Sequence, residues 1–152
     1  MNKKYKKIAV GGTFDKFHRG HEKLLSTAFE MGEEVLIGVT SDNFASNKNH
    51  EIELYSIRVN RIHNFVRKYN IPYVIKEIFY AYGTADKDSA LDAIVVSKET
   101  EKTALKINEK RCQNNFKLLD IIVIEWVLAS DGIPISSTRI RKGEIDTVGK
   151  TL

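Results

Sequence analysis

The chain has 152 residues, of which 42% are hydrophobic and 29% are charged, and its net charge is +4 at pH 7. This length predicts a single domain over residues 1–152 that buries a core without help from metals or disulfides. The single Cys112 excludes an internal disulfide, no apolar run is long enough to span a bilayer, and no segment resembles a signal peptide. We therefore expect a cytoplasmic protein, whose oligomeric state the sequence leaves open with the monomer slightly favoured.

The modest basic excess suits anionic small substrates as well as nucleic acid. Lysines cluster near the N-terminus, but no basic stretch studded with aromatic side chains follows them to stack bases. We therefore expect neither nucleic acid nor a membrane among the partners.

Short apolar runs alternate with helical patterns along the chain. Apolar, β-branched runs predict strands, and apolar residues at helical spacing predict helices. The predicted strands are 8–12, 34–40, 71–79, 93–97 and 118–127; the predicted helices run from after Gly20 to Gly32, over 54–69, from 98–100 onward and from 136–138 onward. The first helix completes a βαβ unit, whose crossover is parallel and right-handed. The sequence therefore predicts an α/β fold, a single Rossmann-like, doubly wound domain with a five-stranded parallel sheet.

The stretch from Ile8 to His21 is the most informative in the chain. Three apolar residues run into Gly11 and Gly12, and His18 and His21 follow at the start of the first helix. Unpaired backbone N–H groups and the positive end of the helix dipole point there, so a phosphate meets donors from both main chain and imidazole. A glycine-rich turn with one hydrogen-bonded and one solvated histidine is the alternative. The whole string is similar to the G-G-T-F-D-x-x-H-x-G-H signature of the nucleotidyltransferase superfamily, which transfers a nucleotide to a phosphorylated acceptor.

Residues 136–143 form a second candidate site. A Ser-Ser-Thr run followed by basic residues combines hydroxyls, helix N–H groups and guanidiniums, which suits a polyphosphate tail, although an ordinary helix cap also fits. Ser97, Glu99 and Thr100 open another helix, where they either cap it or line a nucleotide pocket.

Two basic residues have two interpretations each. Lys48 lies in the polar loop 41–53 at the carboxyl edge of the sheet, where ligands collect, but a loop lysine is more often solvated. Arg58 interrupts the apolar stripe of its helix and needs an anion there. That anion is either Glu51 or Glu53, or a substrate phosphate at the start of the helix.

Several stretches together resemble the phosphopantetheine adenylyltransferase family, in its archaeal and eukaryotic-like branch. The matching stretches are 11–21, 96–100, 104–111 and 129–146, so the resemblance runs nearly end to end. It implies the reaction of ATP with 4′-phosphopantetheine to give dephospho-coenzyme A and pyrophosphate, with Mg²⁺ accompanying ATP. No carboxylate cluster predicts a dedicated metal site, and Asp15, the only acid in the first motif, is open to a structural role.

The resemblance also implies roles for individual residues. The acceptor would be bound by Thr13, Phe14, Lys48 and Arg58, and the catalytic residues would be His18, Lys48 and Arg139. ATP would be bound by Gly12, His18, His21, Ser97, Glu99, Thr100, Ser136, Ser137, Thr138 and Arg139, with 136–139 on the β- and γ-phosphates. The acceptor phosphate is already a nucleophile, so positioning and charge neutralisation matter more than a general base.

Related enzymes share the first motif, and they leave alternatives open. An FAD synthetase or a glycerol-phosphate cytidylyltransferase acts on another phosphorylated acceptor, and a non-catalytic nucleotide-binding module is the alternative from a different class. Cytidylyltransferases resemble R-T-x-G-I-S-T-T at the second motif, where this chain reads I-S-S-T-R-I-R. That difference favours adenylyl transfer to phosphopantetheine.

Overall fold

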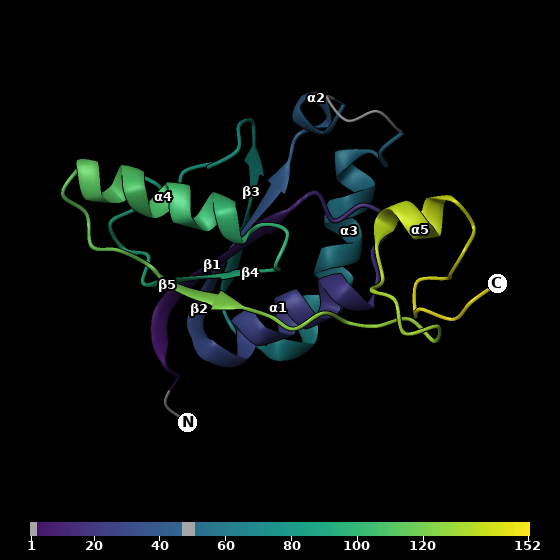
Figure 1. Cartoon of the computed structure of the whole chain (residues 1–152). Helices are drawn as coiled ribbons and strands as arrows, with labels where there is room; N and C mark the ends of the chain where they lie inside the picture. The colour runs from purple at the N-terminus through teal and green to yellow at the C-terminus, as the bar shows by residue number, and fades with distance from the viewer. Residues whose placement is uncertain (1–2, 47–50) are drawn as a thin grey trace.

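The computed structural model, which describes residues 3–46 and 51–152, contains one sheet in which every neighbouring pair of strands is parallel (Figure 1). The strands stand in the order β3-β2-β1-β4-β5. They are β1 (Tyr5–Gly12), β2 (Gly32–Thr40), β3 (Tyr73–Ile78), β4 (Ala93–Val96) and β5 (Asp120–Val123). The predicted α/β fold with a five-stranded parallel sheet is confirmed. The strand order reverses between β1 and β4, and in such sheets this switch point is where ligands bind.

The helices of the described residues connect these strands. They are α1 (Arg19–Met31), α2 (Asp42–Ala45), α3 (Tyr55–Val66), the short 3₁₀ helix η1 (Arg67–Tyr69), α4 (Glu101–Gln113) and α5 (Ser137–Arg141). Within the two described ranges, none of them has the length and apolar character needed to cross a membrane.

Helices cover both faces of the sheet, with α1 and α3 on one face and α4 on the other (Figure 1). Side chains of a strand alternate between the faces, so Ile8 and Val10 of β1 pack with Phe29 in the core under α1. Ala9, between them, belongs to a second core cluster with Ile107 of α4. This burial on both faces explains why the strands read as continuous apolar runs.

Some element boundaries differ from the prediction. β5 ends at Val123, although its apolar run continues to Val127, because its pairing with β4 ends at Val96. The loop expected over 41–53 begins with α2. Gly32 ends α1 as expected, but its backbone is extended at φ −110°, and its missing side chain is needed because a Cβ would overlap Ile8.

The chain after α5 folds back as a C-terminal hook, residues 143–152. Ile145 of the hook is buried with Ile135 in a third, small core cluster. The carbonyl of Thr147 accepts a hydrogen bond from the N–H of Arg19, at 3.1 Å. The hook thus connects α5 to the first residue of α1, and Figure 1 shows it beside α5 at the C-terminus.

Candidate active site

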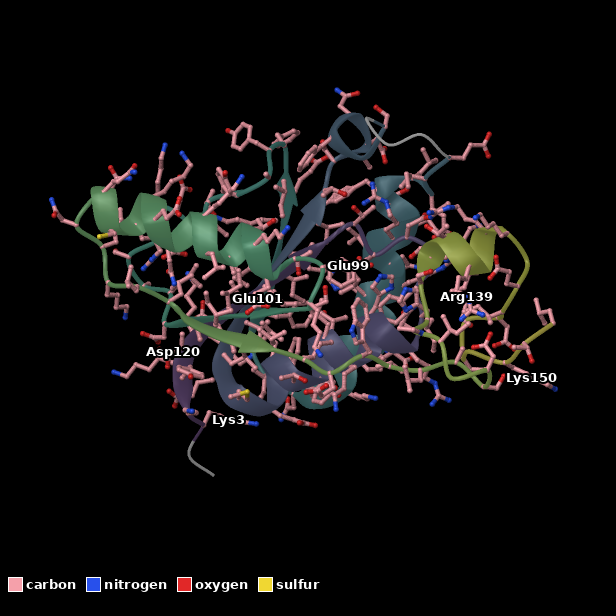
Figure 2. All side chains as sticks on the ribbon, in the orientation of Figure 1. Lys3, Glu99, Glu101, Asp120, Arg139 and Lys150 are labelled. Carbon is pink, nitrogen blue, oxygen red and sulfur yellow. The ribbon has the colours of Figure 1, made fainter. Side chains whose placement is uncertain are left out.

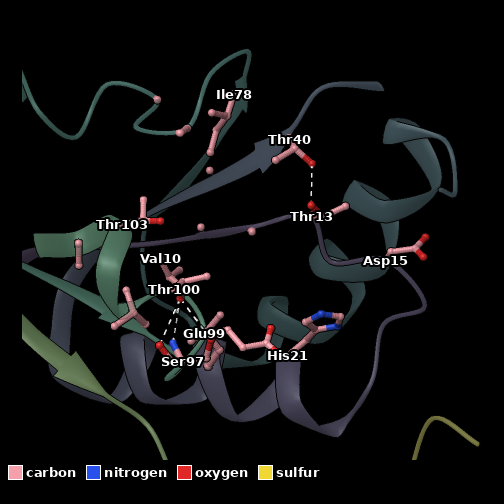
Figure 3. A pocket seen from close by; sticks show the side chains of 18 of the residues that line it. Val10, Thr13, Asp15, His21, Thr40, Ile78, Ser97, Glu99, Thr100 and Thr103 are labelled. Carbon is pink, nitrogen blue, oxygen red and sulfur yellow. Dashed lines mark hydrogen bonds between the residues drawn. The ribbon is translucent and has the colours of Figure 1, made fainter. Parts of the chain in front are cut away.

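A cavity of about 800 Å³ lies at the carboxyl edge of the sheet, on the face that α4 covers. Its walls come from both sequence motifs: residues 11–13 and 20–21 after β1, and 136–138 at α5. The turn 97–100 after β4 adds a further side, and Figure 3 shows it facing the first motif across the cavity. This volume is in the range of small-molecule sites, and the parallel sheet places such a site at this edge.

His18 and His21 stand at the start of α1 with their rings stacked, the centroids 3.7 Å apart. Nδ1 of His18 accepts the N–H of Gly20 at 3.0 Å, and Nδ1 of His21 accepts the N–H of His18 at 3.2 Å. These bonds form a reciprocal cap for the helix. Because each Nδ1 accepts a backbone N–H, each neutral ring carries its proton on Nε2. Both residues line the cavity, so each offers it an Nε2–H donor.

Burial keeps both rings uncharged at neutral pH. It lowers the pKa of His18 to about 4, against a smaller opposing effect from the Asp15 carboxylate. Burial and the neighbouring His18 hold the pKa of His21 well below its usual range. At neutral pH the pair therefore offers a ligand neutral hydrogen-bond donors and not imidazolium cations.

Asp15 joins the two motifs. Its carboxylate accepts the N–H of Glu53 at 2.9 Å and Nη1 of Arg141 at 2.5 Å. Its backbone carbonyl accepts the hydroxyl of Ser137 at 2.6 Å. Asp15 is only 3% exposed and all of these contacts are within the protein, which fits a structural role.

The chain is similar over nearly its whole length to curated archaeal proteins. Phosphopantetheine adenylyltransferase of Methanothermobacter thermautotrophicus is 52% identical over 98% of this chain and 91% of that protein. The enzyme of that name from Methanosarcina barkeri is 47% identical over 95% of this chain and 91% of that protein. The one from Thermococcus kodakarensis is 43% identical over 100% of this chain and 94% of that protein. The family model described as cytidylyltransferase-like matches residues 9–143. This chain belongs to the phosphopantetheine adenylyltransferase family.

Solved structures share the architecture. A protein of unknown function from Archaeoglobus fulgidus superposes with a TM-score of 0.74 at 33% identity, covering 86% of this chain and 99% of that one. Pantothenate synthetase from Thermus thermophilus has a TM-score of 0.61 at 12% identity, covering 90% of this chain and 62% of that one, a likeness of fold alone.

Arg139, expected among the catalytic and ATP-binding residues of the family, is directed elsewhere. Its guanidinium binds the carboxylates of Asp131 and Glu144 and reaches the carbonyls of 133 and 134. It is absent from the cavity lining, whereas Arg141 is part of it (Figure 2 labels Arg139 beside α5). In the structure Arg139 lies away from the cavity, and Arg141 is the arginine that the second motif presents to it.

Helical spacing could have shown which of Arg139 and Arg141 lies on the same face of α5 as Thr138. Residues three apart on a helix share a face, and Thr138 accepts a hydrogen bond from Arg141 Nη2 at 3.1 Å. Ser136 caps α5 by accepting the N–H of Arg139 at 3.2 Å, and Ser137 uses its hydroxyl hydrogen on Asp15. The three hydroxyl residues of the second motif line the cavity, as the ATP-binding prediction requires.

Arg58, expected to bind the acceptor, is instead part of the protein frame. Its guanidinium donates to the carbonyls of Glu53, Thr13 and Thr40, at 2.7, 2.9 and 2.8 Å, and to the carboxylate of Asp42 at 3.0 Å. Its side chain is fully buried. In the structure Arg58 therefore binds protein groups, and its place in the apolar stripe of α3 reflects a buried network that holds the ends of β1 and β2 together.

Thr13 remains at the surface of the cavity. Thr40 donates its hydroxyl hydrogen to Thr13 Oγ1 at 3.1 Å, a bond drawn in Figure 3, and itself accepts from Arg58. This chain of bonds orients the Thr13 hydroxyl so that its own hydrogen serves a further acceptor. Phe14 differs, because its ring is 1% exposed, packs 5.2 Å from the His21 ring and is not part of the lining. Its expected contact with substrate is wrong for the side chain.

Two amides at the start of α1 are not free, although the sequence suggested that they would be. The N–H of Arg19 donates to Thr147, and the N–H of Gly20 donates to His18. Protein atoms already satisfy these two donors, so the expectation is wrong for Arg19 and Gly20. The imidazole Nε2–H groups are further donors from this turn.

The remaining predicted residues are placed as follows. Gly12, Ser97, Glu99 and Thr100 line the cavity, and Thr100 Oγ1 accepts the N–H of Ser97 at 3.1 Å (Figure 3). Thr100 therefore closes its own turn and does not cap α4 with its side chain. Lys48 lies outside the described residues.

Proposed function

We infer that the protein transfers the adenylyl group of ATP to 4′-phosphopantetheine, giving dephospho-coenzyme A and pyrophosphate in coenzyme A biosynthesis. The names of the relatives, at up to 52% identity over nearly the whole chain, support this reaction. The single structural observation that carries it is the meeting of the two motifs in one cavity, where Ser137 bonds to Asp15. A triphosphate held between these motifs has hydrogen-bond donors on both sides.

In the reaction, an oxygen of the acceptor phosphate attacks the α-phosphorus of ATP. The bond from the α-phosphorus to the bridging oxygen breaks, and pyrophosphate leaves with the electron pair. Negative charge grows on the phosphate oxygens, and the Nε2–H groups of His18 and His21 and the guanidinium of Arg141 stabilise it. The nucleophile is already ionised, so the residues need only align it and neutralise charge.

We assign the acceptor phosphate to Thr13 and the nucleotide to the turn of Ser97, Glu99 and Thr100. Thr13 lies on the first motif beside the end of β2, and the turn lies across the cavity from it (Figure 3). Lys48 stays in the proposal as an acceptor-binding residue from the family resemblance.

Mg²⁺ enters as part of the Mg–ATP substrate. The residues of the cavity do not suit a resident metal, because the buried carboxylate of Asp15 is already bonded to Arg141 and to the backbone of Glu53. In the part of the chain that the structure describes, no three carboxylate, histidine or cysteine side chains gather as metal ligands. The cation would then be held by ATP oxygens, and its contribution is to neutralise charge on the leaving pyrophosphate.

We propose that the reaction takes place in the cytoplasm on a monomer, without a nucleic-acid or membrane partner. Purified protein with Mg–ATP is to be tested for pyrophosphate release with 4′-phosphopantetheine and, as alternatives, with riboflavin phosphate, glycerol phosphate and nicotinamide mononucleotide. Release with phosphopantetheine alone is expected. Release with another acceptor and none with phosphopantetheine would overturn the assignment, and tight ATP binding without turnover on any acceptor would favour a nucleotide-binding module.

A further inference from the structure

The guanidinium of Arg141 is bonded to the carboxylate of Asp15, which is 3% exposed and lies beside it in the cavity wall. We propose that Asp15 is a positioning residue, which fixes the plane of the Arg141 guanidinium at the cavity before ATP binds. The orientation of Arg141 in the second motif thereby depends on Asp15 of the first motif. This inference rests on the proposed function, because it assigns a task to a residue of the same site.

The contacts of Asp15 leave its carboxylate one orientation. One oxygen accepts the N–H of Glu53 at 2.9 Å, and the other accepts Nη1 of Arg141 at 2.5 Å. The backbone of Asp15 is fixed as well, since its carbonyl accepts the hydroxyl of Ser137. With 3% exposure, the group is screened little by solvent, so its attraction for a guanidinium is strong.

Arg141 needs such a partner because its own helix does little to place it. α5 has five residues, and none of them is buried. An arginine on so short a helix, with its side chain 16% exposed, still has several rotamers, and fixing one of them costs up to about 2 kcal/mol of side-chain entropy. Bonds from Nη1 to Asp15 and from Nη2 to Thr138 both help to hold the planar guanidinium. Preorganised charge of this kind stabilises a transition state without reorganisation during the reaction.

A second pair on the same helix has the same chemistry but no access to the cavity. Arg139 binds Asp131, yet neither residue lines the cavity. Removing the charge of Asp131 therefore perturbs an aspartate–arginine pair of α5 without touching the reaction. It is the matched control for Asp15.

The test uses Asp15→Asn, which keeps the size of the side chain and an acceptor for the N–H of Glu53. We expect kcat/KM for ATP to fall about 10- to 100-fold, the loss typical of one charge-assisted contact, with the KM for phosphopantetheine within about threefold. Asp131→Asn should change both parameters less than about threefold. A KM for phosphopantetheine that rises as much as that for ATP would overturn the proposal, since general loosening of the site predicts equal effects.

A double-mutant cycle identifies the route of the effect. If Asp15 acts through Arg141, Asp15→Asn should cost less than about threefold further in an Arg141→Ala background. An equal cost in both backgrounds would mean that Asp15 acts on another group, which overturns the inference. Failure of the wild type to release pyrophosphate from any acceptor would instead contradict the proposed function.

A measurement on the wild type covers the case in which Asp15→Asn does not fold. Arginine-selective ¹⁵N spectra should show separate, slowly exchanging Nη signals for Arg141, assigned by their loss in Arg141→Lys. Averaged signals from a freely rotating guanidinium would overturn the inference.

Discussion

Replacing Arg58 distinguishes a structural arginine from a substrate-binding one. Arg58→Met keeps most of the apolar stem but removes every donor of the guanidinium. The carbonyls of Thr13, Thr40 and Glu53 then lose their partner in a site where Arg58 itself is fully buried. Each buried acceptor left without a donor costs about 1–3 kcal/mol, so three of them predict a loss of about 3–9 kcal/mol. That is a large part of the roughly 5–15 kcal/mol that stabilises an ordinary domain.

Arg61 provides the control, because it lies one turn further along α3. Its side chain is 44% exposed, and it pairs with the Glu53 carboxylate at 2.7 Å. Such an exposed ion pair contributes about 0–1 kcal/mol. Arg61→Met should therefore change the free energy of unfolding by less than about 1 kcal/mol.

Urea unfolding followed by circular dichroism measures both variants. With a slope of about 2 kcal/mol per molar urea, Arg58→Met should lower the midpoint by about 1.5–4.5 M and Arg61→Met by less than about 0.5 M. Arg58→Lys, which keeps the charge but loses the fork, serves if the methionine variant does not fold. A KM for phosphopantetheine raised tenfold in Arg58→Met, with unchanged unfolding, would refute the structural assignment.

His18, Arg141 and Gly149 each allow a further test. His18→Asn keeps a helix-cap acceptor and should lower kcat by about 10²–10³. His18 takes up a proton near pH 6.5 in the unfolded chain but only near pH 4 in the folded protein. The free energy of unfolding of the wild type should therefore fall by about 3 kcal/mol as the pH drops from 6.5 to 4. Unfolding experiments at several pH values should show a smaller fall for the variant. In steady-state kinetics, Arg141→Ala should raise the KM for ATP about 10-fold or more, whereas Arg139→Ala should change it less than about threefold. A larger rise for Arg139→Ala than for Arg141→Ala would support ATP binding by Arg139, as the sequence predicts. Gly149→Ala should destabilise the protein by about 1–3 kcal/mol more than Gly132→Ala in urea unfolding. Both glycines have a positive φ, +87° at Gly149 and +81° at Gly132, so the backbone strain is similar. Of the two, only Gly149 has neighbouring atoms that an added Cβ would meet. Equal losses at the two glycines would refute the packing contribution.

The fold could be predicted because its signals are local. Runs such as 34–40 and 93–96 are apolar on both faces, which in a short segment indicates a strand inside a parallel sheet. The glycines and histidines of the first motif mark the end of one such strand and the start of a helix, and the parallel sheet fixes the edge at which they lie. The limits of β5 were less predictable, because they depend on where the partner strand stops.

The arginines show where local signals stop. Arg139 and Arg141 have the same side chain two positions apart, and only the direction of a short helix decides which of them meets the cavity. Phe14 belongs to the first motif, yet its ring packs into the core. Residue type suggested the chemistry at these positions, while the direction of each side chain depended on segments far away in the chain.

The sequence by itself determined the family, the parallel α/β fold and the stretches that form the site, because apolar periodicity and motif spacing are properties of neighbouring residues. Only the tertiary structure decided which donors remain for a ligand. The carbonyl of Thr147 accepts the N–H of the first residue of α1, and the Arg58 guanidinium donates to three carbonyls. The carboxylate of Asp15 accepts a hydrogen bond from Arg141. Each of these bonds joins segments distant in sequence, and a buried donor binds whichever acceptor the fold brings to it.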